Sequence, residues 1–277
     1  MKTINCKGNL IDLSTPKVMG VINLTPDSFY DGGKLTSEKE ILLQANKMLQ
    51  EGATFLDLGA YSSRPGAQFV SEKEEIHRLL PVIKILLNEF PETLLSIDTF
   101  RSNVANESIY AGASLINDIS AGTLDDHMFK IIAQHQVPYV MMHMRGTPET
   151  MMQNTDYTNL TKEVIYYFSE RIAKARSFGI NDLIVDPGFG FSKTLDQNYD
   201  LFNDLELFRY LNAPLLIGIS RKSMIQKKIK TTAADSLNGT TALHAIAIQK
   251  GVSILRVHDV KEAFETINLL QNLKFHQ

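Results

Sequence analysis

Short apolar runs rich in Val, Ile and Leu alternate along the chain with longer segments in which apolar residues recur every three or four positions. Short continuous runs are typical of strands buried on both faces, and the longer period is typical of amphipathic helices. A glycine that can end a helix lies just beyond three of the helical segments, at Gly52, Gly179 and Gly251. The pattern predicts helices over residues 38–50, 160–178 and 237–250, and strands over residues 18–23, 55–60, 94–99, 115–120, 139–144, 183–187, 215–220 and 254–259.

This order of elements predicts an α/β fold, a (β/α)8 barrel of the TIM type. An open doubly wound sheet is the simplest competing arrangement, and the count of eight strands favours the barrel. Residues 3–6 and 10–13 flank Lys7-Gly8-Asn9, which predicts a short N-terminal β-hairpin at the N-terminal end of the barrel. No low-complexity tract or composition shift marks a linker, so we expect a single domain over residues 1–277.

Charge and cysteine content exclude several classes of partner and site. The 28 basic and 31 acidic residues give a net charge of −3, so we expect no nucleic acid partner. The single cysteine, Cys6, cannot form an intrachain disulfide or a cysteine metal cluster, which is typical of a reducing compartment. We find no secretory leader and no apolar run of about 18 residues, so we expect a cytoplasmic protein without a membrane anchor.

Polar residues follow the predicted strands at the ends that converge in a barrel. Asp186 is the most informative, because it directly follows an apolar run and precedes the glycine-rich segment 187–191. Its carboxylate could accept two parallel N–H bonds from an amino-pyrimidinone, and Met142 and Phe191 could supply walls for the ring. The residues suited to the edge of such a flat heterocycle, here named the heterocycle set, are Asp98, Asn117, Asp186 and Lys222.

A second group is rich in donors and positive charge, as a phosphate or diphosphate requires. This group, the anion set, comprises Asn23, Ser63, Arg64, Arg256 and His258. Arg256 and His258 are two apart in a strand and should point the same way, and the buried guanidinium needs an anion, either a ligand or Asp259. A diphosphate usually arrives with Mg2+, for which the amide oxygen of Asn23 is the candidate protein ligand.

Several of these residues also have structural explanations. A strand-end Asp98 or Asn117 can simply cap the following helix, and Asp57 and Asp118 lie deeper or one residue away from better candidates. His143 is explained equally well as a satisfied core histidine and as a ligand contact, and it is not included among the candidate site residues. The chain contains no Walker loop, HExxH pair or GxSxG elbow, and Cys6 lacks an activating neighbour, so we expect no covalent catalysis by the protein.

Eight motifs, in order and over nearly the whole chain, together resemble the dihydropteroate synthase family. They are Met19 to Phe29, Ser63 to Gly66, Ser96 to Thr99, Asn117 to Ser120, Met142 to Met144, Asp186 to Phe191, Ser220 to Ser223 and Arg256 to Asp259. The resemblance implies condensation of (7,8-dihydropterin-6-yl)methyl diphosphate with 4-aminobenzoate, which gives 7,8-dihydropteroate and diphosphate in folate biosynthesis. It also implies a homodimer, Mg2+ as cofactor and competition by sulfonamides that mimic 4-aminobenzoate.

The resemblance assigns roles to the candidate residues. The heterocycle set would hold the pterin with Met142, Phe191 and Gly218, and the anion set would hold the diphosphate and its Mg2+. Ser220, expected at a helix N-terminus, would receive the carboxylate of 4-aminobenzoate. The walls of that second pocket would be Phe29, Pro65, Phe191 and Lys222. Asp98, Lys222 and Arg64 are the expected catalytic residues of a dissociative mechanism, in which diphosphate leaves before the aryl amine attacks.

The chain departs from the family pattern after the second predicted strand. The family usually reads Gly-Glu-Ser-Thr-Arg-Pro-Gly, whereas this chain reads Ala60-Tyr61-Ser62-Ser63-Arg64-Pro65-Gly66, so that Tyr61 replaces an acid. This substitution is the one feature that favours a non-catalytic pterin-binding paralogue. A second alternative is a pterin barrel that passes a methyl group from methyltetrahydrofolate to a corrinoid, although such an enzyme has no use for the anion set.

Overall fold

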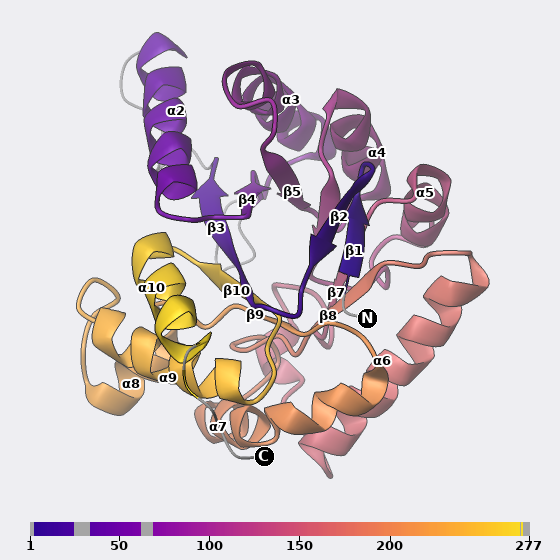
Figure 1. The fold of residues 1–277 in the computed structure, drawn as a ribbon. Coiled ribbons are helices and arrows are strands. Elements are labelled where there is room, and N and C mark those ends of the chain that lie inside the picture. Colours follow the sequence, from indigo (N-terminus) through magenta and orange to yellow (C-terminus); the bar gives the residue numbers. More distant parts are fainter. Residues whose placement is uncertain (1–2, 25–33, 62–68, 272, 274–277) are drawn as a thin grey trace.

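An eight-stranded parallel barrel forms the centre of the molecule (Figure 1). The computed structural model describes residues 3–24, 34–61, 69–271 and 273. The strands run in the order β8-β7-β6-β5-β4-β3-β10-β9, and a parallel bridge between Val185 and Leu215 joins the two ends of the sheet. Their bounds are β3 (Lys17–Asn23), β4 (Phe55–Gly59), β5 (Leu94–Asp98), β6 (Leu115–Asp118), β7 (Tyr139–Met142), β8 (Leu183–Asp186), β9 (Leu216–Ile217) and β10 (Ile254–Val257). The predicted barrel and its eight strands are confirmed, and most strands end earlier than predicted.

Helices surround the barrel (Figure 1). They are α2 (Lys34–Gln50), α3 (Glu72–Glu89), α4 (Ser102–Ala111), α5 (Met128–His135), α6 (Leu160–Ser177), α7 (Leu195–Asn203), α8 (Ser223–Ile229), α9 (Leu237–Gln249) and α10 (Val260–Gln271), with short 3-10 helices η1 (Met151–Gln153) and η2 (Leu205–Leu211). The three predicted helices correspond to α2, α6 and α9. Side chains of Ser71, Asn159 and Thr194 cap the starts of α3, α6 and α7. In the described part of the chain, no helix has the length and apolarity needed to cross a membrane.

One predicted helix start is wrong. Ser220 was expected at the N-terminus of a helix, but α8 begins three residues later, at Ser223, with Lys222 as its N-cap residue. The reason is Arg221, whose φ of 55° lies in the left-handed region that a right-handed helix excludes. Its guanidinium is held by Asp259 at 2.7 and 2.8 Å, which anchors this turn outside the helix.

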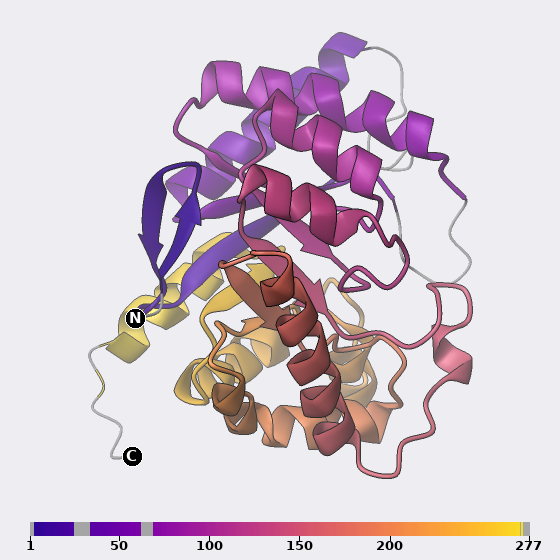
Figure 2. The same cartoon turned by 90° about the vertical axis from the view of Figure 1, so that its right-hand side faces the viewer.

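The N-terminal hairpin closes one end of the barrel, as predicted. Strands β1 (Thr3–Cys6) and β2 (Asn9–Asp12) pair antiparallel around Lys7 and Gly8, both with positive φ, the geometry of a tight type I′ turn. The hairpin lies across the barrel end (Figures 1 and 2), and in Figure 2 it is the indigo element on the left. Ile4, Cys6 and Leu13 pack there against inward side chains of the strands, which are Met19, Phe55, Leu115, Val140, Ile184, Leu216 and Ile254. Cys6 is fully buried in this apolar floor, and burial raises the pKa of its thiol to about 12.

The alternation of side chains along each strand places a polar layer directly above the apolar floor. A residue two positions beyond a floor residue faces the same interior. This relation joins Phe55 to Asp57, Leu115 to Asn117, Val140 to Met142, Ile184 to Asp186, Leu216 to Gly218 and Ile254 to Arg256. The intervening residues, such as Leu255 and Val257, pack in the outer core against the helices. The C-terminal end of the barrel therefore carries the chemistry.

Candidate active site

Arg256 lies at the centre of the polar layer and binds two carboxylates. Its Nε donates to an oxygen of Asp57 at 2.6 Å, and its Nη2 donates to Asp98 at 2.8 Å. Fully buried Asp57 also accepts hydrogen bonds from the hydroxyl of Ser96 at 2.5 Å and from the amide of Asn117 at 3.2 Å. Asp57 therefore fixes the orientation of Arg256 and Asn117 together, which agrees with its predicted supporting role.

The anion that Arg256 needs is thus the pair Asp57 and Asp98. The alternative partner named from the sequence, Asp259, is wrong, because both oxygens of Asp259 bind Arg221. The contact between Arg256 and Asp98 also joins the two sets of residues that were separated in the sequence. In three dimensions Arg256 of the anion set is joined directly to Asp98 and, through Asp57, to Asn117 of the heterocycle set.

The pKa values of Asp98 and Arg256 are strongly shifted in this network. Burial raises the pKa of Asp98 to about 7, against the opposing effect of Arg256 and with a further upward contribution from Asp57. Burial lowers the pKa of Arg256, but Asp57 and Asp98 outweigh it and raise that pKa, so the guanidinium stays charged. Side chains of Arg256 and Asp98 are 21% and 23% exposed, so both reach the mouth of the barrel. Concentrated, shifted charges of this kind are typical of a functional site.

Asp186 ends β8 and shapes the turn that follows it. Its Oδ1 accepts the backbone N–H of Gly188 at 2.8 Å, and the residue is only 6% exposed. Gly188 has a φ of 71°, and a Cβ at this position would lie 2.2 Å from the carbonyl oxygen of His143, so only glycine fits. Burial raises the pKa of Asp186, with Lys222 and the Gly188 N–H opposing the shift. One carboxylate oxygen thus binds the turn, and among the described residues no hydrogen-bond donor meets the other.

Lys222 faces Asp186 across the site. Its Nζ donates to the carbonyl oxygen of Phe189 at 2.5 Å and lies 4.9 Å from the centre of the Phe191 ring. Burial lowers the pKa of Lys222 to about 8, with Asp186 opposing the shift and Arg256 adding to it. A Cβ at Gly218 would lie 3.9 Å from this Nζ, which places Gly218 beside Lys222 and Arg256.

An apolar cluster borders the charged groups. Met142 is 4% exposed and packs with Ile119, Met144 and Met151, and Phe191 packs against the same cluster. The predicted ring walls, Met142 and Phe191, therefore belong to one surface beside Asp186 and Lys222.

The remaining predicted residues lie at the rim or outside the described chain. The buried Ser220 accepts the backbone N–H of His258 through its Oγ at 3.2 Å, which ties the turn after β9 to the end of β10. Asn23 is exposed at the C-terminal end of β3, where it pairs in register with Gly59. Phe29, Ser63, Arg64 and Pro65 lie outside the described residues.

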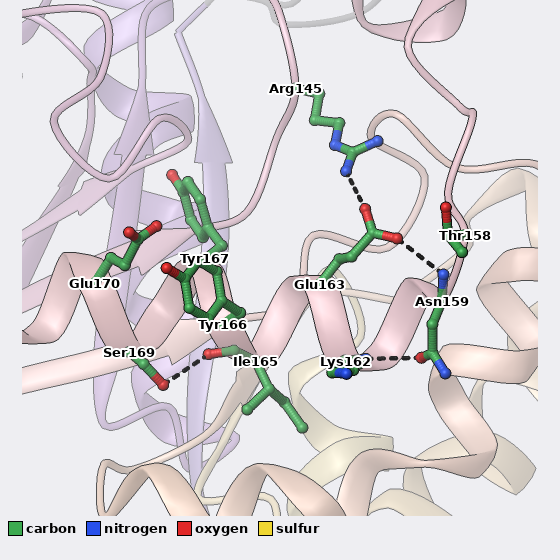
Figure 3. Close-up of a pocket in the computed structure, with 10 residues that line it drawn as sticks. All are labelled: Arg145, Thr158, Asn159, Lys162, Glu163, Ile165, Tyr166, Tyr167, Ser169 and Glu170. Atoms are coloured by element: carbon green, nitrogen blue, oxygen red, sulfur yellow. Dashed lines mark hydrogen bonds and ion pairs between the residues drawn. The ribbon is translucent and has the colours of Figure 1, made fainter.

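A cavity of about 600 Å³ lies elsewhere, along α6 (Figure 3). It is lined by Arg145, residues of α6 and the segment just before that helix, and none of the predicted site residues borders it. Figure 3 shows Arg145 pointing to Glu163, and the two are 2.5 Å apart. The cavity is therefore separate from the polar layer at the barrel mouth.

Comparison with known proteins identifies the family. Residues 19–258 match the family described as Pterin binding enzyme. Dihydropteroate synthase of Escherichia coli strain K12 is 42% identical over 267 residues, which cover 96% of this chain and 94% of the relative. The chain belongs to the dihydropteroate synthase family. It is an enzyme of folate biosynthesis with dihydropteroate synthase activity, as the motifs predicted, so the corrinoid methyltransferase and the non-catalytic paralogue are set aside.

Solved dihydropteroate synthases share the whole fold. The enzyme of Yersinia pestis, in complex with a sulfonamide drug, has a TM-score of 0.90 and 39% identity over 97% of this chain and 98% of its own. The enzyme of Xanthomonas albilineans with 4-aminobenzoic acid has a TM-score of 0.90 and 35% identity over 98% of this chain and 99% of its own. These similarities confirm the parallel barrel with its N-terminal hairpin.

Tyr61, at which the chain departs from the dihydropteroate synthase pattern, contacts Glu149, Phe100 and Arg101. The Tyr61 hydroxyl lies 3.2 Å from a carboxylate oxygen of Glu149, and its ring meets Phe100 edge-on at 5.2 Å. The guanidinium of Arg101 lies 5.3 Å from the Tyr61 ring and is anchored by the buried Glu75 at 2.5 Å. Tyr61 thus links the end of β4 to the segment after β7, a role that an acid could not fill beside Glu149.

Sequence reasoning missed one residue close to the site, Lys193. A lysine in a polar loop is normally solvated, but Lys193 is only 2% exposed. Its Nζ lies 3.0 Å from Nδ1 of His143, which confirms His143 as a core residue with a partner. The available signal was the position of Lys193 just after Gly-Phe-Gly-Phe-Ser, in a segment already assigned to the site.

Proposed function

We propose that the chain condenses (7,8-dihydropterin-6-yl)methyl diphosphate with 4-aminobenzoate and releases 7,8-dihydropteroate and diphosphate. The observation that carries the proposal is the contact of Arg256 with Asp98, within reach of Asp186 and Lys222. A site that recognises a neutral heterocycle beside a charged leaving group needs this combination of carboxylates and cations. The complex of the Xanthomonas albilineans enzyme with 4-aminobenzoic acid supports the identity of the second substrate.

The pterin would bind between the heterocycle set and the apolar cluster. Asp186 has lone pairs left for two ring N–H donors after its bond to Gly188, while Asn117 and Lys222 would meet the other ring heteroatoms. Met142 and Phe191 would contact the ring faces, and Gly218 leaves room beside Lys222 and Arg256.

The diphosphate would bind to Arg256 and to the rim. Two of the five N–H donors of Arg256 are used by Asp57 and Asp98, which leaves three for phosphate oxygens. We assign Asn23 and His258 to the same ligand, together with Ser63 and Arg64 from the part of the chain outside the described residues.

We propose a dissociative reaction. The C–O bond to diphosphate breaks and its electron pair leaves with the diphosphate, whose charge Arg256 and Arg64 would neutralise. In its deprotonated form, Asp98 would stabilise the resulting pterinylmethyl cation from a fixed position in a partly desolvated site. The lone pair of the aryl amine then forms the new C–N bond, and the amine nitrogen gives up one proton to water.

The 4-aminobenzoate carboxylate would bind near Ser220. Because Ser220 Oγ accepts the His258 N–H, its own hydroxyl proton remains able to donate to a carboxylate. Lys222 and Phe191, with 4.9 Å between the Lys222 Nζ and the ring centre, would separate this position from the pterin pocket. Phe29 and Pro65 are assigned to the same pocket from the sequence. A sulfonamide would compete here.

Mg2+ fits the residues present only if the substrate supplies most of its ligands. Within the described ranges, no group of three or more His, Cys, Asp or Glu side chains could hold a metal ion. The exposed amide of Asn23 offers one oxygen, which suits an ion bound chiefly by diphosphate and water. When bound, Mg2+ would neutralise charge on the leaving group.

The proposed reaction predicts diphosphate release that requires both substrates. In a coupled assay we expect release only when 4-aminobenzoate is present, loss of activity with EDTA, and recovery when Mg2+ is added back. Omission of 4-aminobenzoate is the control. Release that is independent of 4-aminobenzoate would contradict the condensation, and full activity in EDTA would remove Mg2+ from the proposal.

Activity should fall as the pH rises through about 8. Lys222 has its pKa lowered to about 8, and above that pH it loses the positive charge that faces Asp186. The pH profile of kcat/KM measures this alkaline limb in the free enzyme. In Lys222→Arg, the guanidinium stays protonated, so the limb near pH 8 should disappear from whatever activity remains. The same limb in Lys222→Arg would assign it to another group.

Three expectations about the whole molecule stay predictions. We propose that residues 1–277 form one domain, that two copies form a homodimer and that the enzyme works in the cytoplasm. Light scattering of the purified chain measures the second of these.

A further inference from the structure

Lys193 is buried behind the loop that connects Asp186 to the rest of the site. Its Nζ lies 3.1 Å from the carbonyl oxygen of Gly188, 3.0 Å from that of Phe191 and 3.0 Å from Nδ1 of His143. A protonated lysine has three N–H donors, which match these three acceptors, and burial lowers the pKa of Lys193 to about 7 against the opposing effect of Asp186. Lys193 therefore binds protein alone and has no donor left for a substrate.

The His143 ring is neutral and can therefore accept a hydrogen bond from Lys193. Burial lowers the pKa of His143 well below the usual value, and Lys193 and Arg145 lower it further, so the ring is neutral. A neutral ring that accepts at Nδ1 carries its proton on Nε2. Tyr167 packs edge-on against this ring at 4.9 Å between centroids, which fixes its position.

The loop held by Lys193 has an unusual backbone. Gly188, Gly190 and Ser192 have φ values of 71°, 82° and 45°, so left-handed residues alternate with ordinary ones. A non-glycine residue such as Ser192 adopts this region at a cost and needs surrounding contacts to stay there. The bonds from Lys193 to the carbonyl groups of Gly188 and Phe191 provide such contacts on both sides of Gly190.

Two lysines bind successive parts of this loop from different sides. Lys193 holds Gly188 and Phe191 from within the protein, while Lys222 binds the carbonyl oxygen of Phe189 from the site. The Phe189 side chain is fully buried and packs on Phe202, with 6.0 Å between the ring centres. The Phe191 ring instead faces Lys222 at 4.9 Å. A shift at either carbonyl held by Lys193 would therefore move the Phe191 ring and the acceptor of Lys222 together.

We propose that Lys193 is a positioning residue of the reaction, which holds the Gly188 and Phe191 carbonyl groups against His143 and thereby fixes the Phe191 ring and the Lys222 ammonium. This inference rests on the proposed function, because it takes Phe191 and Lys222 as the wall shared by the pterin and 4-aminobenzoate pockets. Lys193 contacts neither substrate. Its effect should be larger on 4-aminobenzoate than on the pterin, because Asp186 keeps its own bond to the Gly188 N–H when Lys193 is lost and loses only the electrostatic effect of Lys193.

Lys193→Met is the primary test, because methionine has a similar length and no donor. We expect KM for 4-aminobenzoate to rise at least tenfold and kcat to fall, while the calorimetric Kd for a pterin alone rises by a smaller factor. Lys250→Met is the matched control, since Lys250 also donates to a backbone carbonyl, that of Asn203 at 2.8 Å, but far from the site. It should leave both kinetic constants unchanged. Altered thermal unfolding of Lys193→Met with unchanged kcat and KM would overturn the proposal.

A second pair of variants tests the same contact from the other side. His143→Gln keeps an acceptor for Lys193 and should retain near-normal KM, whereas His143→Leu removes the acceptor and should reproduce the effect of Lys193→Met. The double variant should be no worse than either single one, because both break the same unit. If Lys193→Met does not fold, the comparison of the two His143 variants decides, and equal KM values for 4-aminobenzoate in both would overturn the proposal.

The assay of the wild-type chain distinguishes a failure of this proposal from a failure of the proposed function. If wild type releases no diphosphate in the presence of 4-aminobenzoate, the proposed reaction is wrong, whatever the variants do. If wild type is active and Lys193→Met matches it in kcat and in KM for 4-aminobenzoate, only the positioning role is wrong.

Discussion

Replacing Asp186 by asparagine should weaken pterin binding by roughly 100-fold, or about 3 kcal/mol. Oδ1 of Asp186 already accepts the N–H of Gly188, so the amide oxygen of asparagine would take that place. The amide NH2 would then face one N–H donor of the pterin, so that one of the two attractive contacts becomes a repulsive one. Calorimetry with a pterin ligand measures the loss directly.

Stability should change in the opposite direction. Burial raises the pKa of Asp186, which means that the folded chain holds a carboxylate that prefers to be neutral. Asparagine removes this cost, so Asp186→Asn should unfold at the same or a higher temperature without ligand. Asp196→Asn, an exposed position in the first turn of α7, is the control and should bind pterin normally. An unchanged Kd in Asp186→Asn would remove Asp186 from the pterin site.

Replacing Arg256 by methionine should destabilise the fold and nearly abolish catalysis. The guanidinium bridges Asp57 and Asp98, and its loss leaves two neighbouring carboxylates without a cation, which costs about 3–5 kcal/mol of unfolding free energy. It also removes the charge proposed to receive the leaving diphosphate, for which a loss of about 100-fold to 1,000-fold in kcat is expected. Urea unfolding and steady-state kinetics measure the two effects.

The stability deficit of Arg256→Met should depend on pH. The pKa of Asp98 is already about 7 in the intact site, above its ordinary value of 3.8, and loss of Arg256 removes the effect that opposes this shift. A group with a raised folded-state pKa contributes stability at low pH that is lost as the pH rises through that pKa. The deficit should therefore be larger at pH 8 than at pH 5.

Two further variants complete the Arg256 test. Asp57→Asn added to Arg256→Met should restore part of the stability but not the activity, because it removes one of the unpaired carboxylates. Arg209→Met, at an exposed position, should be neutral. A deficit of equal size at pH 5 and pH 8 would contradict the proposed electrostatic origin.

The sequence predicted the barrel because its signals are local and repeated. Apolar runs of strand length mark each strand, and the alternation along a strand decides which residues share the interior, so that the polar layer could be named residue by residue. The late start of α8 was missed, because it depends on the single left-handed residue Arg221, a conformation that the arginine side chain does not predict. The strand predicted over residues 215–220 is shorter in the structure, where β9 covers Leu216–Ile217.

The partners within the site could not be read from the sequence for a different reason. Asp259 is three residues from Arg256 along the chain, whereas Asp57 is 199 residues away and lies on β4. The register of the strands around the barrel brings Asp57 under the guanidinium, and only the folded structure gives that register. Lys193 was missed for the same reason, since its burial depends on a loop whose carbonyl groups turn inward.

Cys6, which packs in the apolar cluster between the hairpin and the barrel, can report opening of this end of the barrel. Cys6 is the single cysteine of the sequence, fully buried, with the pKa of its thiol raised to about 12. Thiolate is the species that alkylating reagents attack, so the thiol reacts only when β1 leaves the barrel. The rate of Cys6 alkylation in the wild-type chain therefore measures how often the hairpin detaches from the barrel. Substrates bound at the opposite end would slow that rate only if both ends of the barrel open together.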